Sequence, residues 1–237
     1  MEDNNYITKF NRTDLIGKMA ASVVHEIRNP ITSVKGFVQL LKNKIIMEEY
    51  SDYFNLIIEE LDRANEILTE YLSLARDKKD ADLQRQDINE ILTALLPLLR
   101  ADAIKAGKNV LLQTGEINEL WVDPKDIRQV VLNLARNGLE AMAKGGTLAI
   151  RTYMEKEFVV LEVKDSGCGI PEDIMNNLGA PFVSTKENGT GLGLFVCFRI
   201  LDTYKATVTV DSSSQGTNFI IRFPYQDGVL SHSSECC

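Results

Sequence analysis

Apolar residues recur at helical intervals through the first third of the chain. Between residues 54 and 75 they are separated by alternating steps of three and four, which is the spacing of a heptad seam. The members of this seam are Phe54, Ile57, Leu61, Ala64, Leu68, Tyr71 and Ala75. A less regular series precedes it and consists of Ile16, Met19, Val23, Ile27, Ile31, Val34, Val38, Leu41 and Ile45. The pattern predicts two long amphipathic helices.

The short polar stretch around residues 42–49 separates these two series. It predicts a turn that folds the helices back on each other as an antiparallel hairpin. A single hairpin cannot bury its whole seam, so we expect two copies of the chain to associate as a four-helix bundle. The alternative is a hairpin that packs on the second domain of its own chain.

The periodicity changes beyond residue 76. Residues 77–86 (DKKDADLQRQ) are strongly charged and predict a linker. Helices are then predicted over 87–106, 123–143 and 194–204, and strands over 110–113, 148–153, 158–163, 207–211 and 218–223. Asp87 and Asp123-Pro124 are typical helix starts, and Gly107 is a typical stop. Strand hairpins with helices on one face predict an α+β sandwich. The predicted parts are residues 1–80, 81–226 and a polar tail at 227–237.

Composition and charge exclude several classes of protein. The 237 residues carry a net charge of −8, which argues against a nucleic-acid partner. No apolar run reaches the roughly 18 residues of a membrane span, and no signal peptide precedes the first helix. We therefore expect a cytoplasmic segment, with membrane attachment only through an N-terminal sensor region of a longer parent. The four cysteines lack zinc spacing and are expected to be reduced thiols.

Histidine chemistry, if present, depends on one residue. The sequence has two histidines, and His232 lies in the polar tail. On a helix, His25 is about 200° round from Val23 and points away from the apolar seam. A surface histidine without function would look the same. An exposed position also suits a nucleophile that a separate domain must reach.

The neighbours of His25 favour the nucleophile. Glu26 offers a carboxylate that can accept a proton from one ring nitrogen while the other nitrogen attacks phosphorus. Asn29 lies one turn along on the same face, where its amide could hold a water or a phosphoryl oxygen. Pro30 is expected to bend or loosen the helix beside the histidine.

A second group of polar residues suits a nucleotide. No P-loop or protein-kinase motif occurs. Instead, Asn133 and Asn137 share one face of a predicted helix, with Arg136 beside them. Amide oxygens are suitable ligands for Mg²⁺, and a guanidinium can clamp phosphates. Paired asparagines can equally be ordinary surface polarity.

Two glycine-bearing segments follow. In Asp165-Ser166-Gly167-Cys168-Gly169-Ile170-Pro171 the glycines permit close approach of a ligand, and the carboxylate can accept from an exocyclic amine. A plain turn between strand and helix is the alternative. In Gly189-Thr190-Gly191-Leu192-Gly193-Leu194 the glycines open a helix, whose free N–H groups favour phosphate. A polar loop precedes this second segment, so it is not a Rossmann fingerprint.

The segment His25-Glu26-Ile27-Arg28-Asn29-Pro30 resembles the H box of sensor histidine kinases. The resemblance implies that His25 is the phosphoacceptor, that Glu26 is its base, and that Asn29 assists phosphatase activity toward a response regulator. It extends over about residues 10 to 225, because further segments resemble the nucleotide boxes in the family's order. The N box corresponds to residues 133–138, the G1 box to 165–171, the F box to 181–182, the G2 box to 189–194 and the final glycine box to 216–217. Gly138 replaces the usual alanine of the N box, a small departure that we expect to be tolerated.

The resemblance also assigns a nucleotide site. Asp165 is expected to bind the adenine amino group, Asn137 to bind Mg²⁺, and the stretch from Gly179 to Gly189 to form a mobile lid over ATP. Lys186 in this lid either meets the phosphates or is solvated. The full set of expected ATP-binding residues is Asn133, Arg136, Asn137, Asp165, Gly167, Gly169, Phe182, Lys186, Gly189, Thr190, Gly191, Leu192, Gly193 and Thr217.

Taken as a whole, the resemblance implies a helical hairpin that dimerises to a four-helix bundle, followed by an α/β sandwich of the Bergerat type. The implied activity is ATP-dependent autophosphorylation of His25, then transfer to an aspartate of a response regulator receiver domain. A homodimer and a small inhibitory protein on the bundle are the other expected partners. Residues 36–41 (GFVQLL) and 181–186 (PFVSTK) look closest to sporulation-type phosphorelay kinases.

Two other functions fit parts of the chain. ATPases of the gyrase and chaperone kind share the sandwich, but they activate water with an acidic residue one turn before the metal-binding asparagine. This chain has Asn133 there, and it adds a histidine-bearing hairpin. The second alternative is a dimeric phosphotransfer scaffold whose nucleotide domain is inactive, which the intact Asp165, Asn137 and glycine motifs disfavour.

Overall fold

The computed structural model describes residues 82–184, 186 and 189–225, with isolated helical positions at 30, 33, 34, 53, 56, 57, 60 and 64. The chain divides into two compact units, Met1–Asp77 with Ala180–Gly193, and Lys78–Gly179 with Leu194–Cys237. His25, Glu26 and Asn29 lie outside the described residues, as do most of the two predicted seams and the tail. What the sequence predicts for them stays a prediction.

Three of the isolated positions of the first unit belong to the predicted seams. Val34, Ile57 and Ala64 are seam positions, and all three are helical and half-buried. Tyr53 and Leu56 lie outside the seam, and their exposed fractions are 36% and 38%. Pro30, Ser33 and Glu60 also lie outside the seam, yet Pro30 is buried and the other two are half-buried. Burial at the described positions therefore does not separate seam residues from the others, and the seam stays a prediction.

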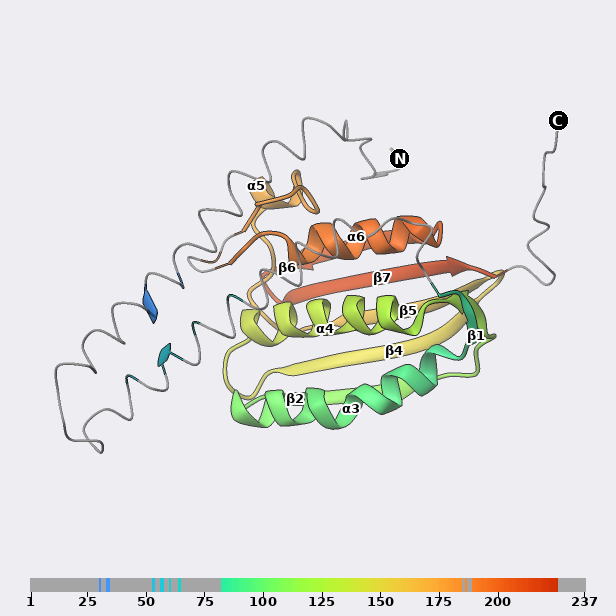
Figure 1. Cartoon of the computed structure of the whole chain (residues 1–237), viewed down its shortest axis with the longest axis horizontal. Helices are drawn as coiled ribbons and strands as arrows, with labels where there is room; N and C mark the ends of the chain where they lie inside the picture. The colour runs from blue at the N-terminus through green and yellow to red at the C-terminus, as the bar shows by residue number, and fades with distance from the viewer. Residues whose placement is uncertain are drawn as a thin grey trace. The chain divides into compact units, whose positions relative to one another are not determined.

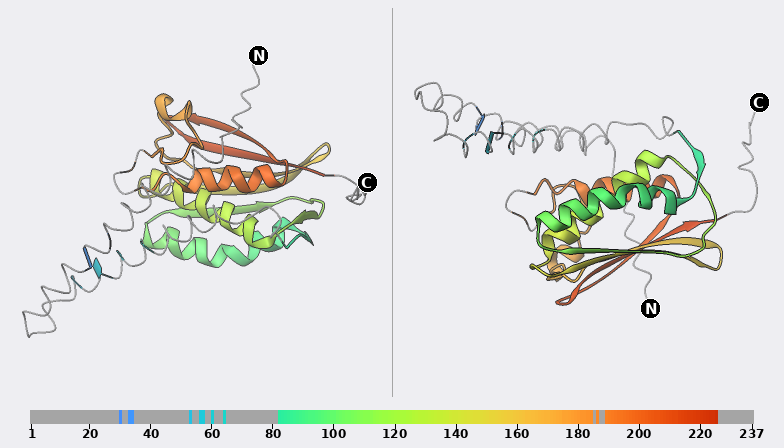
Figure 2. Two further views of the ribbon diagram at one scale, coloured as in Figure 1. Left: turned by 45° about the horizontal axis from the view of Figure 1, so that its top comes forward. Right: turned by 90° about the horizontal axis from the view of Figure 1, so that it is seen from below.

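The second unit is built on a five-stranded sheet with the strand order β2-β4-β5-β7-β6 (Figure 1). The strands are β2 (Asn109–Thr114), β4 (Thr147–Glu155), β5 (Phe158–Lys164), β6 (Thr207–Ser213) and β7 (Gly216–Pro224). β2 pairs parallel with β4, and every other pairing in this sheet is antiparallel. Figure 2 shows that one face is covered by the helices α3 (Ile88–Lys105), α4 (Pro124–Ala141) and α6 (Gly193–Thr203). The predicted sandwich is confirmed.

Capping residues set the ends of the two long helices. The Asp87 side chain accepts a hydrogen bond from the backbone N–H of Asn89 at 2.8 Å and starts α3. The helix stops at Ala106, and Gly107 follows with a φ of 69°. Asp123 caps α4, whose first residue is the proline predicted there. The predicted helix boundaries are therefore correct to within about two residues.

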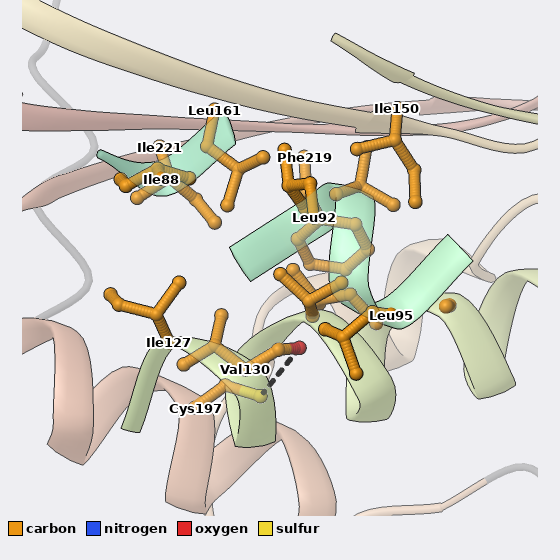
Figure 3. Close-up of a cluster of buried hydrophobic side chains, with 14 of the residues drawn as sticks. Ile88, Leu92, Leu95, Ile127, Val130, Ile150, Leu161, Cys197, Phe219 and Ile221 are labelled. Atoms are coloured by element: carbon orange, nitrogen blue, oxygen red, sulfur yellow. Dashed lines mark hydrogen bonds between the residues drawn. The ribbon is translucent and has the colours of Figure 1, made fainter. Parts of the chain in front are cut away.

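The core lies between the helices and the sheet (Figure 3). The three covering helices and three strands of the sheet, β4, β5 and β7, contribute buried apolar side chains. Among them are Ile88, Leu92, Leu95, Ile127, Val130, Cys197, Ile150, Leu161, Phe219 and Ile221. Full burial of one such aliphatic or aromatic side chain contributes about 1.5–3 kcal/mol. This packing fixes α4 on the sheet and thereby positions the polar face of that helix.

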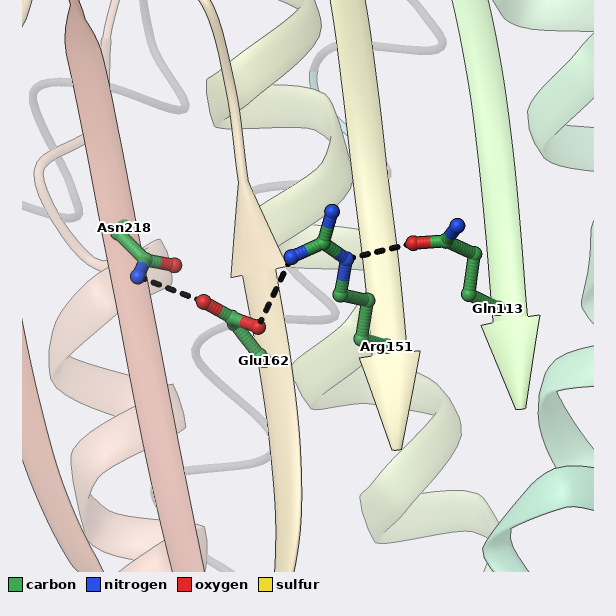
Figure 4. A network of polar contacts seen from close by, with 4 residues as sticks. All are labelled: Gln113, Arg151, Glu162 and Asn218. Atoms are coloured by element: carbon green, nitrogen blue, oxygen red, sulfur yellow. Dashed lines mark hydrogen bonds and ion pairs between the residues drawn. The ribbon is translucent and has the colours of Figure 1, made fainter. Parts of the chain in front are cut away.

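The opposite face of the sheet carries a polar row (Figure 4). Arg151 donates to Oε1 of Gln113 at 2.6 Å and lies 3.9 Å from a carboxylate oxygen of Glu162. Asn218 donates to the other oxygen of Glu162 at 2.8 Å. Four strands, β2, β4, β5 and β7, are linked through this row.

Three short elements depart from the sequence predictions. β1 (Gln84–Gln86) pairs antiparallel with β3 (Leu120–Val122), so the prediction of a linker over 77–86 is wrong for its last three residues. The one-turn helix α5 (Glu172–Met175) was not predicted either. Elements of three or four residues are too short for an apolar period, and they form because partners such as β3 are supplied by the fold. Within the described part of the chain, no helix has the length and apolarity to cross a bilayer.

Candidate nucleotide site

Helix α4 carries the predicted amide pair on its polar face. Its apolar face, Ile127, Val130, Val131 and Leu134, is fully buried, as predicted. Asn133 and Asn137 are half-buried on the same helix, one turn apart, and Arg136 between them is exposed. The packing of the apolar face thus leaves two amides and a guanidinium at the edge of the core.

Asp165 directly follows β5 and is only 6% exposed. Its Oδ1 accepts from the backbone N–H of Gly167 at 2.7 Å and from that of Thr217 at 3.2 Å. The Asp165 N–H in turn donates to the Thr217 carbonyl at 2.9 Å. Thr217, at the start of β7, is therefore beside the aspartate, and one oxygen of the carboxylate is fixed by the protein backbone.

The other oxygen of Asp165, Oδ2, differs from the first. It makes no hydrogen bond to any residue that the structure describes. Burial raises the pKa of Asp165, while the hydrogen bonds from Gly167 and Thr217 act in the opposite direction. Among the described residues, the one fully buried side-chain oxygen or nitrogen without a partner is Oδ1 of Asn218, so Oδ2 of Asp165 is open to solvent or to a ligand. Such a carboxylate oxygen is a strong acceptor for a ligand N–H.

The loop that carries Asp165 lies against the C-terminal half of α4. A Cβ added at Gly138 would lie 3.1 Å from Cβ of Asp165 and 3.6 Å from its Oδ2. It would also lie 2.8 Å from Cδ1 of Leu148, which is fully buried. Farther along the loop, Cys168 N–H donates to the Ala141 carbonyl at 3.2 Å. The glycine at position 138 therefore permits a close approach, so this departure from the usual alanine fits the fold.

The donor set on α4 fits a magnesium ion held together with a nucleotide. Within the described part of the chain, no group of three His, Cys, Asp or Glu side chains comes together as a metal site. Mg²⁺ in nucleotide sites takes one or two oxygen ligands from the protein, and phosphates and water supply the others. The half-buried Asn137 can supply such an oxygen, and Asn133 lies one turn before it.

The remaining predicted nucleotide residues belong to the other compact unit. Phe182 N–H donates to the Gly191 carbonyl at 3.1 Å, and Gly189 N–H donates to the Lys186 carbonyl at 3.1 Å. The Leu192 N–H donates to Thr190 Oγ1 at 3.2 Å, just before α6 begins at Gly193. These bonds give the segment its own local structure. Its predicted role over ATP stays a prediction.

A buried polar cluster surrounds the start of α4. The sequence indicated Asp123 as the helix cap, but it gave no signal for the contacts of this region with Asp82 and Tyr204. Asp123 is fully buried, and its two oxygens accept from the N–H groups of Lys125 at 2.8 Å and Asp82 at 3.2 Å. Tyr204 donates to Asp126 at 2.6 Å and accepts from the Asp123 N–H at 3.1 Å. Burial, and then the hydrogen bond to Asp126, raise the pKa of Tyr204. This cluster joins α4 to the end of α6.

Ser212, in β6, was also missed by the sequence analysis. Its hydroxyl accepts from Ile170 N–H at 2.7 Å and lies 3.2 Å from Thr217 Oγ1. In the sequence it is one of three consecutive serines in a polar turn, with nothing to distinguish it from Ser213 or Ser214. Only the pairing of distant segments shows its place beside the Asp165 loop.

Two family models match this chain, in the order that the predicted domains have. Residues 15–80 match the His Kinase A (phospho-acceptor) domain. Residues 122–227 match the histidine kinase-, DNA gyrase B-, and HSP90-like ATPase. The two matched ranges contain His25 and the α4–Asp165 site, respectively.

Individual proteins resemble nearly the whole chain. Sporulation kinase A of Bacillus subtilis is 38% identical over 220 residues, which cover 91% of this chain and 36% of the relative. The structure of histidine kinase ThkA in complex with response regulator protein TrrA has a TM-score of 0.76 and 29% identity, over 91% of this chain and 63% of that one. Full-length ShkA in complex with AMPPNP has a TM-score of 0.67 and 25% identity, over 89% and 46%.

The chain spans between 30% and 50% of the length of the sporulation kinases that it matches. Its similarity to them includes both matched modules, since each alignment extends over about 90% of this chain. A phosphoacceptor module followed by a nucleotide-binding module is the arrangement expected from the H box and the glycine boxes. The chain therefore belongs to the sensor histidine kinase family.

Proposed function

We propose that this chain binds ATP with Mg²⁺ and phosphorylates itself on His25, as the core of a histidine kinase in a two-component or phosphorelay system. The observation that carries the proposal is the buried Asp165 carboxylate. Its Oδ1 is held by two backbone N–H groups, while Oδ2 has no partner among the described residues. An adenine amino group is a donor that matches this acceptor.

Different residues bind the adenine and the phosphates of ATP. The adenine amine donates to Oδ2 of Asp165, beside Thr217, Gly167 and Gly169. The amides and the guanidinium of α4 bind the phosphates. Asn137 would hold Mg²⁺, which would neutralise part of their charge. From the other unit we assign Phe182, Lys186, Gly189, Thr190, Gly191, Leu192 and Gly193 to the same nucleotide. The helix N-terminus at Gly193 supports phosphate binding by this segment.

The chemical step transfers one phosphoryl group. A ring nitrogen of His25 attacks the γ-phosphorus, the bond from this phosphorus to the β–γ bridging oxygen breaks, and ADP leaves. Glu26 accepts the proton that the ring gives up. Attack must be in line with the leaving oxygen, within a few ångströms. The product, a phosphohistidine, is a phosphoryl donor for an aspartate.

Partners follow from the same assignment. We propose that the hairpin of residues 1–80 dimerises, that 81–226 form the ATP-binding domain and 227–237 a polar tail, and that a response regulator receiver domain accepts the phosphoryl group. Asn29 assists dephosphorylation of that response regulator. The similarity to five sporulation kinases supports a role in sporulation. A small inhibitory protein on the bundle, and attachment of a longer parent to the membrane, remain predictions from the family resemblance.

The two histidines provide a matched test. The full chain with His25→Gln should take up no label from γ-labelled ATP, whereas His232→Gln should label like the original chain. The label should be acid-labile and alkali-stable, as a phosphoramidate is. Both variants should bind ATP equally. Labelling that persists in His25→Gln would refute the phosphoacceptor, and absence of labelling in all three proteins would favour the inactive scaffold.

A further inference from the structure

The loop from Asp165 to Pro171 is tied to the β6–β7 hairpin at two points. At its start, Asp165 exchanges hydrogen bonds with Thr217, since its N–H donates at 2.9 Å and its Oδ1 accepts at 3.2 Å. Near its end, Ile170 N–H donates to the hydroxyl of Ser212 at 2.7 Å. Ser212 lies in β6, opposite Thr217 in the register of the hairpin. The ligand-facing carboxylate is therefore part of a loop with two anchors.

Ser212 takes part in both anchors. Its Oγ accepts from Ile170 and lies 3.2 Å from Oγ1 of Thr217, a residue that is only 3% exposed. A hydroxyl has one proton and two lone pairs, so it can serve both neighbours at once. Alanine at this position would leave the Ile170 N–H without its acceptor and the Thr217 hydroxyl without this partner.

The loop has little room beside this hydroxyl. Gly169 has a φ of +77°, and a Cβ there would lie 2.0 Å from the Ser213 carbonyl oxygen and 3.2 Å from Oγ of Ser212. The backbone of the loop thus lies directly on the end of β6. Because the fit is close, the hydrogen bond from Ile170 fixes the loop with respect to the strand that also presents Ser212.

We propose that Ser212 is a positioning residue for recognition of the adenine amine. It acts through the loop and through Thr217, which together set the direction in which Oδ2 of Asp165 presents its lone pairs. The inference rests on the proposed function, because it requires that Oδ2 accept from adenine. It adds a residue that lies outside all the motifs of the sequence analysis.

Two nucleotides and two neighbouring serines provide the test. Binding of ATP is compared with binding of purine riboside triphosphate, which lacks the exocyclic amine, to the full chain. Ser212→Ala should weaken ATP binding by about 3- to 10-fold, the range that one lost neutral hydrogen bond gives. Binding of the analogue should weaken less than binding of ATP, so the ratio of the two affinities should decrease. Ser213→Ala is the control, because the one hydrogen bond described for its exposed hydroxyl is accepted from Gln215 N–H in the turn, at 3.2 Å.

Three results would overturn the proposal. One is an equal loss for both nucleotides in Ser212→Ala, which would indicate a general effect on the fold. Another is unchanged ATP binding in that variant. The third concerns the unaltered chain: if the Ile170 amide exchanges its hydrogen as fast as an unbonded amide, the anchor does not exist, whatever the variant does.

Asp165→Asn in the same assay separates this inference from the proposed function. If the original chain does not prefer ATP over the analogue, or if Asp165→Asn keeps that preference, then adenine recognition by Asp165 is wrong. If Asp165→Asn removes the preference and Ser212→Ala leaves it intact, then only the role of Ser212 is wrong.

Discussion

Asp123 and Asp165 are two buried carboxylates that the fold treats differently. Each directly follows a strand, and their exposed fractions are 0% and 6%. Both oxygens of Asp123 accept from backbone N–H groups of the protein, those of Lys125 and Asp82. Both hydrogen bonds described for the carboxylate of Asp165 fall on the same oxygen, Oδ1.

Under the proposed function, the difference separates a carboxylate that serves stability from one that serves binding. A buried acceptor that is left without a donor costs free energy, so a fold normally satisfies both oxygens. Asp123 follows this rule, and it joins α4 to the segment before β1. Oδ2 of Asp165 has no donor but is not enclosed, since in the described part of the chain the one fully buried side-chain oxygen or nitrogen without a partner is Oδ1 of Asn218. An accessible oxygen, on a carboxylate whose other oxygen is fixed, is available to a hydrogen-bond donor of a ligand.

The comparison is tested most strongly at Asp165. In Asp165→Asn, the amide oxygen can keep the two backbone bonds at the Oδ1 position, which turns the NH₂ group toward the adenine amine. A donor then faces a donor. We expect ATP binding to weaken about 10- to 100-fold, in the range of a charge-assisted hydrogen bond. The thermal unfolding midpoint of the ligand-free chain should change little.

Calorimetric titration and thermal unfolding of the same preparation check both halves of this prediction. If the midpoint falls sharply while the affinity of the folded chain is unaltered, Asp165 is a structural carboxylate like Asp123, and the comparison fails.

Asp123→Ala should show the reverse behaviour. It removes the cap of α4 and the acceptor for Asp82 N–H, and we expect a loss of about 2 kcal/mol in the free energy of unfolding. Asp87→Ala is the matched control, because the one hydrogen bond described for the side chain of that cap is to Asn89 N–H. Its loss should be smaller, near 1 kcal/mol.

Urea denaturation gives both values, and ATP titration of the folded variants should give affinities within about two-fold of the original. A larger loss from Asp87→Ala than from Asp123→Ala would show that counting satisfied oxygens is a poor guide to the stability that a buried carboxylate confers.

Glu162 is a third carboxylate, on the other face of the sheet, and shows how much a carboxylate outside the apolar core contributes to stability. Its oxygens interact with Asn218 and Arg151, but the side chain of Arg151 is 47% exposed and the ion pair spans 3.9 Å. Exposed pairs of this kind contribute about 0–1 kcal/mol. Glu162→Gln keeps the acceptor for Asn218, so the expected loss is below about 0.5 kcal/mol. A loss above 1 kcal/mol in urea denaturation would mean that the polar row, and not the apolar core alone, holds the strands together.

Local signals in the sequence were enough for the main elements. Asp87, Asp123-Pro124 and Gly107 set helix ends through interactions within a few residues, so they could be recognised without the fold. The seven residues of β5 carry an apolar pattern strong enough to identify a strand. The short strands β1 and β3 have no such pattern, and each depends on the other for its hydrogen bonds.

The site could be predicted only in part for the same reason. Asp165 was recognisable because glycines follow it in a family motif. The donors and acceptors that fix it come from elsewhere, Thr217 being 52 residues away along the chain. Ser212 gave no signal, because its hydroxyl acquires a specific neighbour only when β6 lies beside the loop. The parallel pairing of β2 with β4 was not predicted either, since register between distant strands is not encoded locally.

The order of strands in the sheet has a consequence for synthesis of the protein. β7 is the last strand that the structure describes, but it lies inside the sheet, between β5 and β6. Growing from its N-terminus, the chain has β5 and β6 available before the strand that joins them. Until β7 leaves the ribosome, Asp165 lacks Thr217 and β6 lacks its partner. A nascent chain therefore cannot complete the surroundings of Asp165 before this point. Under the proposed function, competence to bind nucleotide arises only when β7 has been synthesised.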